Sequence, residues 1–296
     1  MDIGVIVPQG WTGEYDGWEP AAAWSRTVAV ARQAERLGFE SLWVFDHFHT
    51  VPEPTDELTF ESFSTLAALA ALTERVRLGH VVICTAFRNP ALTAKVIGTL
   101  DVISGGRMEL GIGAGWKEDE WLAYGYGFPD TKTRLAMLAD HLEVITRMLG
   151  PGHATFSGPY ATVKDAINEP RGLQRPRVPV IVGGNGPNVT WRLAAKHADE
   201  LNLDWLTPEE VRGALPVIRS RCEEIDRDPA TLRLSVNIGR DTFKIEGPSR
   251  VELLAAYREL GIVRVMGLLQ ASTRSDEALE SLAADVRASG ATLAAG

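Results

Sequence analysis

The sequence predicts an α/β fold, a (β/α)8 TIM barrel with an insertion between the fourth strand–helix unit and the fifth strand. Short apolar runs alternate with longer segments of helical apolar spacing, and this unit occurs eight times along the chain. The length of 296 residues exceeds the roughly 250 residues of such a barrel by about what the insertion supplies. A doubly wound open sheet is the alternative, but it would not explain eight similar units so evenly.

The first four units each pair a short apolar run with a helical segment. The first helix ends at Gly38, a plausible C-cap, and the third helix opens with Pro90 at the favoured first position. The fourth helix carries a clear stripe of leucine and isoleucine. We expect strands at residues 3–7, 41–45, 76–84 and 107–112, and helices at residues 21–37, 60–72, 90–103 and 134–149.

An irregular segment, residues 150–178, interrupts the alternation. It begins with glycine and proline and continues as FSGPYATV, which is typical of a hairpin. Loops this long are usually functional lids or excursions, so we expect an insertion near a mouth of the barrel. Four further units complete a single domain over residues 1–296. Their expected strands are residues 178–182, 198–203, 232–238 and 263–268, and their expected helices are residues 188–197, 208–225, 248–260 and 275–288.

The composition excludes several classes of protein. A formal net charge of -9 argues against a general nucleic-acid or anionic-membrane binder. No run of eighteen apolar residues is present, and the N-terminus begins directly with a strand pattern rather than a signal peptide. Two cysteines, Cys84 and Cys222, do not make a disulfide framework. We therefore expect a cytoplasmic protein that binds a small molecule.

Two strands run directly into glycine-rich turns. Gly111, Gly113 and Gly115 follow the fourth strand, and Gly183-Gly184-Asn185-Gly186 follows the fifth strand and precedes a helix. Glycines at the carboxyl end of a buried strand allow close approach of a ligand, and a helix start is a good anion site. The two junctions suggest one elongated cofactor, although two tight turns without a ligand would give the same pattern.

Asp46-His47, after the second strand, is the best catalytic candidate. Histidine titrates near neutrality, and a neighbouring carboxylate can orient a proton donor. A histidine packed under a loop is the alternative. His47 and His49 also form an H-x-H pattern that metal-dependent hydrolases use, but no other histidine sits clearly at a later strand end. We therefore expect no metal site.

Other residues at the strand ends suit the wall of a pocket. Cys84 fits a small buried thiol that lines a pocket better than a nucleophile, because no base is assured beside it. Trp11 and Trp116 lie near one mouth and would suit a flat ring ligand, so we expect them to line the substrate. Burial of their large apolar surface is the alternative explanation.

Four stretches of the chain carry a resemblance to a known family. They are SLWVFDHFHTVP, FRNPALTAKVIGTLDVISGGRMELGIGAGWKEDEWLAYGYGFP, RLAMLADHLEVITRML and PVIVGGNGPNVTWRLAAKHAD. In content and order they resemble the bacterial luciferase-like family, specifically its branch of oxidoreductases that depend on the deazaflavin coenzyme F420. The resemblance implies a TIM barrel with the cofactor at the carboxyl ends of the strands, and commonly a homodimer.

The resemblance also assigns residues to the cofactor. It implies that Asp46 and His47 sit beside the deazaflavin ring, with His47 near the reactive carbon. It implies a non-prolyl cis peptide between Val81 and Val82 that props the ring, and a phosphate-holding turn at residues 183–186. The full set expected to contact the cofactor is Asp46, Val81, Val82, Cys84, Gly113, Lys117, Gly183, Gly184, Asn185 and Gly186.

The function that these residues favour is an F420-dependent oxidoreductase that transfers hydride between F420 and an unidentified organic substrate. One alternative is an FMN-dependent monooxygenase that uses dioxygen and shares the same barrel. A metal-dependent hydrolase built on His47 and His49 is less favoured. A cofactor-binding protein without turnover is the remaining alternative.

Overall fold

Eight parallel strand positions close into a barrel in the computed structural model, which describes residues 1–239 and 245–294. Residues 240–244 and 295–296, which the single-domain expectation includes, lie outside the described residues. The sheet order is β3-β2-β1-β11-β10-β9-β8-β5-β4, and pairing of β3 with β5 closes it. The strands are β1 (Asp2–Ile6), β2 (Ser41–Val44), β3 (Arg77–His80), β4 (Ile83–Cys84), β5 (Met108–Gly113), β8 (Val180–Gly183), β9 (Glu200–Asp204), β10 (Arg233–Asn237) and β11 (Arg264–Leu268).

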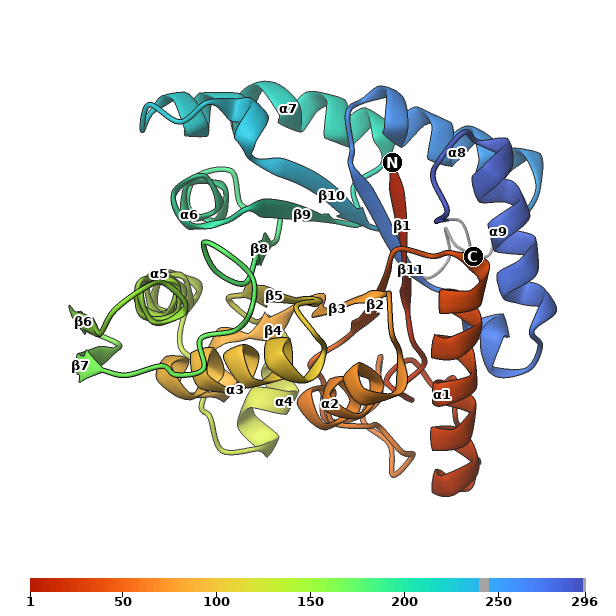
Figure 1. The fold of residues 1–296 in the computed structure, drawn as a ribbon, viewed down its shortest axis with the longest axis horizontal. Helices are drawn as coiled ribbons and strands as arrows, with labels where there is room; N and C mark the ends of the chain where they lie inside the picture. The colour runs from red at the N-terminus through yellow and green to blue at the C-terminus, as the bar shows by residue number, and fades with distance from the viewer. Residues whose placement is uncertain (240–244, 295–296) are drawn as a thin grey trace.

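Helices surround this barrel on all sides (Figure 1). They are α1 (Pro20–Leu37), α2 (Ser62–Leu72), α3 (Pro90–Ile103), α4 (Glu118–Ala123), α5 (Thr131–Leu149), α6 (Thr190–His197), α7 (Pro208–Glu223), α8 (Pro248–Glu259) and α9 (Glu277–Ala288). Gly38 ends α1 in the left-handed conformation, and Asn89 caps the start of α3 through its side chain. The barrel predicted from the sequence is confirmed. Within the described residues, no helix is both long and apolar enough to cross a membrane.

Several elements differ from the sequence-based prediction: α4 was not expected, α2 begins at Ser62 rather than residue 60, and α5 begins at Thr131 rather than residue 134. The strand expected at residues 76–84 is divided into β3 and β4, because the chain bulges at a cis peptide between Val81 and Val82 before pairing resumes at Ile83. The helix expected from residue 188 begins at Thr190, because Val189 still has non-helical dihedral angles.

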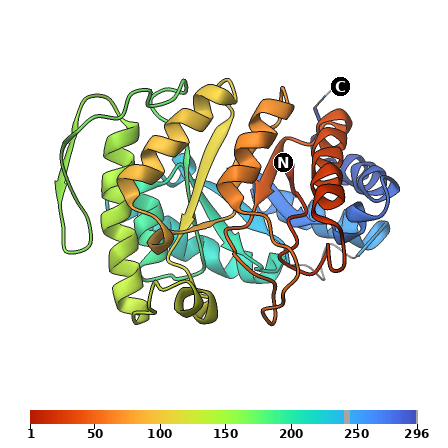
Figure 2. The same ribbon diagram turned by 90° about the horizontal axis from the view of Figure 1, so that it is seen from below.

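The insertion contains an antiparallel hairpin of β6 (Ala154–Ser157) and β7 (Thr162–Ala166), which packs against α5 on the outside of the barrel (Figure 2). After the hairpin, the Gln174 side chain donates hydrogen bonds to Asp101 Oδ1 and to the carbonyl of Met108, both at 2.7 Å. Met108 is the first residue of β5. This part of the insertion therefore lies at the amino-terminal mouth of the barrel, opposite the carboxyl ends of the strands.

The interior of the barrel is filled by a few large side chains and by glycines that make room for them. An apolar layer inside the strands comprises Ile6, Trp43, Val81, Ile181, Met266 and Leu268. A Cβ atom at Gly4 or Gly79 would come within 2.4 Å of the Trp43 ring, so only glycine fits beside this indole. The buried Trp43 thereby fixes the middle of the barrel as a packed core rather than a pore.

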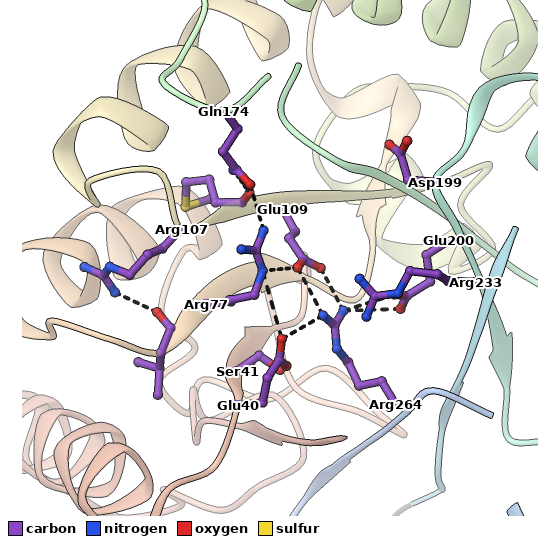
Figure 3. A network of polar contacts seen from close by, with 12 residues as sticks. Glu40, Ser41, Arg77, Arg107, Glu109, Gln174, Asp199, Glu200, Arg233 and Arg264 are labelled. Carbon is purple, nitrogen blue, oxygen red and sulfur yellow. Dashed lines mark hydrogen bonds and ion pairs between the residues drawn. The ribbon is translucent and has the colours of Figure 1, made fainter. Parts of the chain in front are cut away.

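An ion network closes the amino-terminal end of the same interior (Figure 3). The fully buried Arg264 guanidinium donates to Glu109 Oε2 at 2.7 Å, to Glu40 Oε1 at 3.0 Å and to Glu200 Oε1 at 3.3 Å. Arg77 also donates to Glu109. Burial alone would raise the pKa of Glu109, but the charges of Arg264 and Arg77 lower it to about 2. Glu109 is therefore ionised, whereas burial raises the pKa of Glu200.

Removing the arginine from this network should destabilise the whole barrel. In Arg264→Met, the carboxylates of Glu40, Glu109 and Glu200 lose their shared cation, and breaking a buried ion pair costs about 3–5 kcal/mol. We expect a loss of about that size in the free energy of unfolding, measured by urea denaturation. The matched control is Arg219→Met at an exposed position of α7, which should change stability by under about 0.5 kcal/mol. Equal stabilities of the two variants would contradict the role given to the network.

Candidate active site

His47 lies just after β2 and is held on three sides. Its Nδ1 atom is 2.7 Å from Glu120 Oε2. Its ring stacks on Trp11, with ring centroids 4.0 Å apart and an interplanar angle of 3°. The ring of Trp116 meets the His47 ring edge-on, with ring centroids 5.9 Å apart. Nε2 has no hydrogen-bond partner among the described residues, so it is the nitrogen left for a ligand.

Glu120 is the carboxylate that orients His47, and the sequence analysis did not identify it. It lies on α4, is 1% exposed, and also accepts a hydrogen bond from the backbone N–H of Phe48 at 2.9 Å. One carboxyl group thus fixes both the imidazole and the loop that carries it. The available signal was a glutamate in the helix start directly after the glycine turn of β5. The positions of these residues along the sequence do not show that this turn lies opposite the end of β2.

Asp46 is held by contacts within the protein, and its expected roles in catalysis and cofactor binding stay predictions. Its oxygens accept two hydrogen bonds from Arg88, at 2.7 and 2.9 Å, one from Ser62 Oγ at 2.8 Å and one from the Cys84 N–H at 2.9 Å. Burial alone would raise the pKa of Asp46, but the hydrogen bonds and charge of Arg88 lower it. Asp46 is therefore a buried, ionised anchor that joins β2 to β4. It is Glu120, rather than Asp46, that hydrogen-bonds the His47 ring.

The Val81–Val82 peptide is cis, as the resemblance implied. The Val82 side chain lies between two glycines of neighbouring strands. An added Cβ would be 2.9 Å from it at Gly113 and 2.8 Å from it at Gly183. These glycines thus admit the bulge of β3 and β4 into the mouth of the barrel. Contact of Val81, Val82 and Gly113 with a cofactor stays a prediction.

Cys84 and Lys117 both lie buried at the mouth. Burial raises the pKa of the Cys84 thiol to about 12, so it is protonated at neutral pH and unsuited to act as a nucleophile. Lys117 donates from Nζ to Asp119 Oδ2 at 2.6 Å. Trp116 is exposed and meets the His47 ring edge-on, whereas Trp11 is buried under that ring, and a role of either in lining the substrate stays a prediction. Cofactor contacts of Cys84 and Lys117 remain predictions.

The turn at residues 183–186 leads into a helix whose first N–H groups receive no side-chain cap. Gly184 has a φ of +126°, which only glycine adopts readily, and its N–H donates to the carbonyl of Asn202 at 3.0 Å. The helix that follows, α6, receives no side-chain cap at Val189 and has no acidic residue in its first turn. Such an end presents N–H groups and a positive dipole to an anion. The Asn185 side chain instead bonds the backbone of Asp204, at 2.7 and 3.0 Å.

His49 does not join His47 in a metal site. Its Nδ1 atom is 3.1 Å from the carbonyl of Thr50, and its Nε2 atom is 3.9 Å from Asp119. In the part of the chain that the structure describes, no group of three or more His, Cys, Asp and Glu side chains could hold a metal ion. The hydrolase alternative therefore has no ligand set among these residues.

Comparison with known proteins gives a family for most of the chain. The family model for luciferase-like monooxygenases matches residues 1–289. An F420-dependent glucose-6-phosphate dehydrogenase of Intrasporangium calvum is 34% identical over 231 residues, which cover 74% of this chain and 66% of that protein. The corresponding enzyme of Amycolatopsis mediterranei is 30% identical over 73% of this chain and 66% of its own length. The match thus spans just under two thirds of these relatives.

Solved structures share the fold at low sequence identity. An F420-dependent secondary alcohol dehydrogenase, in complex with an F420–acetone adduct, has a TM-score of 0.80 at 19% identity and covers 97% of this chain and 98% of its own. The F420-dependent tetrahydromethanopterin reductase of Methanopyrus kandleri has a TM-score of 0.76 at 18% identity, over 96% of this chain and 97% of its own. A monooxygenase of Streptomyces bottropensis has a TM-score of 0.75 at 19% identity and covers 97% of this chain and 99% of its own. These likenesses support the barrel.

A buried histidine beside the site should make stability depend on pH. His80 is fully buried on β3, neither of its ring nitrogens has a hydrogen-bond partner among the described residues, and its ring contacts Phe63. Burial lowers its pKa to about 4, against an ordinary value of 6.5; Asp46 and Glu61 oppose this shift and Arg88 adds to it. The unfolded chain thus takes up a proton between pH 6.5 and 4 that the folded chain refuses. Stability from this group is complete above pH 6.5 and is lost as the pH falls toward 4.

We expect His80 to account for about 3 kcal/mol of that loss. In His80→Phe, which keeps a ring beside Phe63, the free energy of unfolding should fall less steeply over this range in urea titrations. The control is His153→Gln on the exposed hairpin, which should keep the wild-type slope. An unchanged slope in His80→Phe would show that this histidine is not the titrating group.

Proposed function

The chain belongs to the luciferase-like monooxygenase family, and on that premise we propose that it is an oxidoreductase that transfers hydride between coenzyme F420 and an organic substrate. The observation that carries the proposal is His47, which Glu120 and Trp11 hold in one orientation with Nε2 free at the carboxyl-terminal mouth. Such a group moves a proton when a hydroxyl and a carbonyl are interconverted.

F420 is favoured over FMN by the relatives. The dehydrogenases of Intrasporangium calvum and Amycolatopsis mediterranei are both named for F420, and so are two of the similar structures. The FMN-dependent monooxygenase is less favoured, although the family description and the Streptomyces bottropensis enzyme point toward oxygenation. The residues present fit an elongated anionic cofactor, because the uncapped start of α6 can receive a phosphate.

When bound, F420 would supply a ring carbon that accepts or gives up a hydride. Gly184 and Gly186 would hold its phosphate from the backbone, while the Val82 bulge and the buried Cys84 would line the ring. Each of these residues lies at or just after the carboxyl end of a strand, the end at which TIM barrels place their active sites.

His47 would complete the reaction with the proton. When a substrate hydroxyl becomes a carbonyl, His47 Nε2 would take the proton that the oxygen loses. In the reverse direction His47 would return that proton to the oxygen. Glu120 at Nδ1 offsets the positive charge that the imidazole gains, and stacking on Trp11 fixes the ring plane.

Cofactor binding tests the proposal directly. We expect the purified chain to bind F420 more tightly than FMN in fluorescence titrations. Gly184→Val should weaken F420 binding at least about tenfold, since valine rarely adopts a φ of +126° and the turn must move. Gly213→Val is the control, because a Cβ at this position of α7 meets no atom within 4 Å. Tighter binding of FMN would favour the monooxygenase instead. Full F420 affinity in a folded Gly184→Val protein would contradict the assignment of residues 183–186 as the turn that binds the phosphate.

Replacing His47 should lower the rate of turnover much more than it lowers the affinity for F420. Absorbance assays of F420 reduction with secondary alcohols, and of reduced F420 oxidation with ketones, supply the rate. His47→Ala should lower it by about 10²–10⁴-fold with the F420 dissociation constant nearly unchanged. Glu120→Gln should lower it about tenfold, because an amide can still bond the ring but cannot offset its charge.

The matched control is Glu118→Gln, an exposed position in the same helix turn, which should keep the wild-type rate. A Glu120→Gln protein as active as the control would mean that Glu120 does not assist the proton transfer.

A further inference from the structure

A carboxylate and an amide that the proposed chemistry does not use end two neighbouring strands. Asp204 is the last residue of β9 and Asn237 the last of β10, and the two are paired in register. Asn237 Nδ2 donates to Asp204 Oδ1 at 3.1 Å. The pair thus forms a small polar unit at the carboxyl ends of strands on another side of the barrel from His47.

These two side chains point into the barrel. Asn202, two residues before Asp204, donates to Ser235 Oγ at 2.9 Å and lies 3.9 Å from the sulfur of Met266, which belongs to the interior layer. Side chains two apart on a strand face the same side. Asp204 and Asn237 therefore stand one layer above Asn202 and Ser235, at the mouth where His47 also lies.

The unit contains one buried acceptor without a partner. Asn237 is 5% exposed, yet its Oδ1 atom has no hydrogen-bond partner among the described residues. Asp204 is exposed, and its second oxygen receives no hydrogen bond from these residues. A buried acceptor without a donor costs free energy, so such groups are rare unless a ligand or water satisfies them. Desolvation raises the pKa of Asp204, whereas the Asn237 hydrogen bond lowers it.

The surroundings hold this unit rigidly. The Asn185 side chain fixes the backbone of Asp204 by two hydrogen bonds, and the N–H of Trp205 donates to the carbonyl of Asn237 at 2.8 Å. Trp205 has a φ of +58°, which is unfavourable for a bulky residue and is found chiefly where function requires it. Trp205 is 59% exposed, and its indole ring lies close to Gly239, two residues after Asn237. An exposed aromatic ring near this polar unit suits an ammonium or hydroxyl group on an apolar body.

We propose that Asp204 and Asn237 bind a hydrogen-bond donor of the substrate, a hydroxyl or ammonium group, while Trp205 covers the apolar part of the same molecule. The inference rests on the proposed function, which makes this mouth the place of reaction. It names a substrate class of neutral or cationic molecules, because a phosphate or carboxylate would be repelled by Asp204. The substrate would then differ from the sugar phosphate for which the relatives are named.

Three probes of equal size separate the possibilities: benzylamine, benzyl alcohol and benzoate. Their dissociation constants are measured by ligand-observed NMR, on the chain alone and on the chain with F420. Benzylamine and benzyl alcohol should bind at least about tenfold more tightly than benzoate. Asp204→Asn should remove most of the advantage of benzylamine over benzoate. The control is Asp226→Asn at an exposed turn after α7, which should leave the ranking unchanged.

Each contrary result has a distinct meaning. Benzoate binding as tightly as benzylamine, or an unchanged ranking in folded Asp204→Asn protein, would overturn the proposal. Weaker F420 binding by Asp204→Asn, with the order of the three probes unchanged, would mean that Asp204 binds a donor group of the cofactor. That result would overturn the assignment of Asp204 to the substrate. Failure of the wild-type chain to bind F420 would count against the proposed function alone, because the probe ranking is also read without the cofactor.

Discussion

The mouth of this barrel depends on the carboxylate of Asp46. Its four hydrogen bonds join the end of β2 to Ser62 of α2, to Arg88 and to the backbone of Cys84 in β4. His47 follows directly on one side of this anchor, and the bulge at Val82 precedes Cys84 on the other. A buried ion pair that is bidentate and fully hydrogen-bonded has little freedom to rearrange. Asp46 thus fixes the backbone just before His47 and the wall beside it, while Glu120 orients the imidazole itself.

The two ends of the barrel differ in the polar groups that they bury. At the amino-terminal end, Arg264 forms ion pairs with Glu109, Glu200 and Glu40, and this network joins β11 to β5 and β9. At the carboxyl-terminal end, Asn237 Oδ1 and His47 Nε2 have no hydrogen-bond partner among the described residues. Polar atoms without a partner at the carboxyl ends of the strands agree with the proposed function, since TIM barrels bind their ligands at that end.

Most of the fold follows from local pattern, and much of the site does not. The ends of strands and helices were predicted within a few residues because the signals for them are local. These signals are the periodic spacing of apolar residues, the glycine at position 38 that ends α1 and the proline at position 90 that begins α3. The break between β3 and β4 came from resemblance alone, since VRLGHVVIC reads as one apolar strand. Glu120 and Arg88 were missed because each acts on a residue more than forty positions away, across strands that become neighbours only when the barrel closes.

Family membership and substrate choice depend on different parts of the chain. The stretches that carry the resemblance include His47 and the glycine turn, and the resemblance implies that both face the cofactor. Asp204 and Asn237 lie outside these stretches, at the ends of β9 and β10. A common cofactor requires a common wall on one side of the mouth, while loops on the other side are free to change. A carboxylate in that second wall would select against anions by its charge, so the same barrel could keep the proposed hydride chemistry and act on a different substrate.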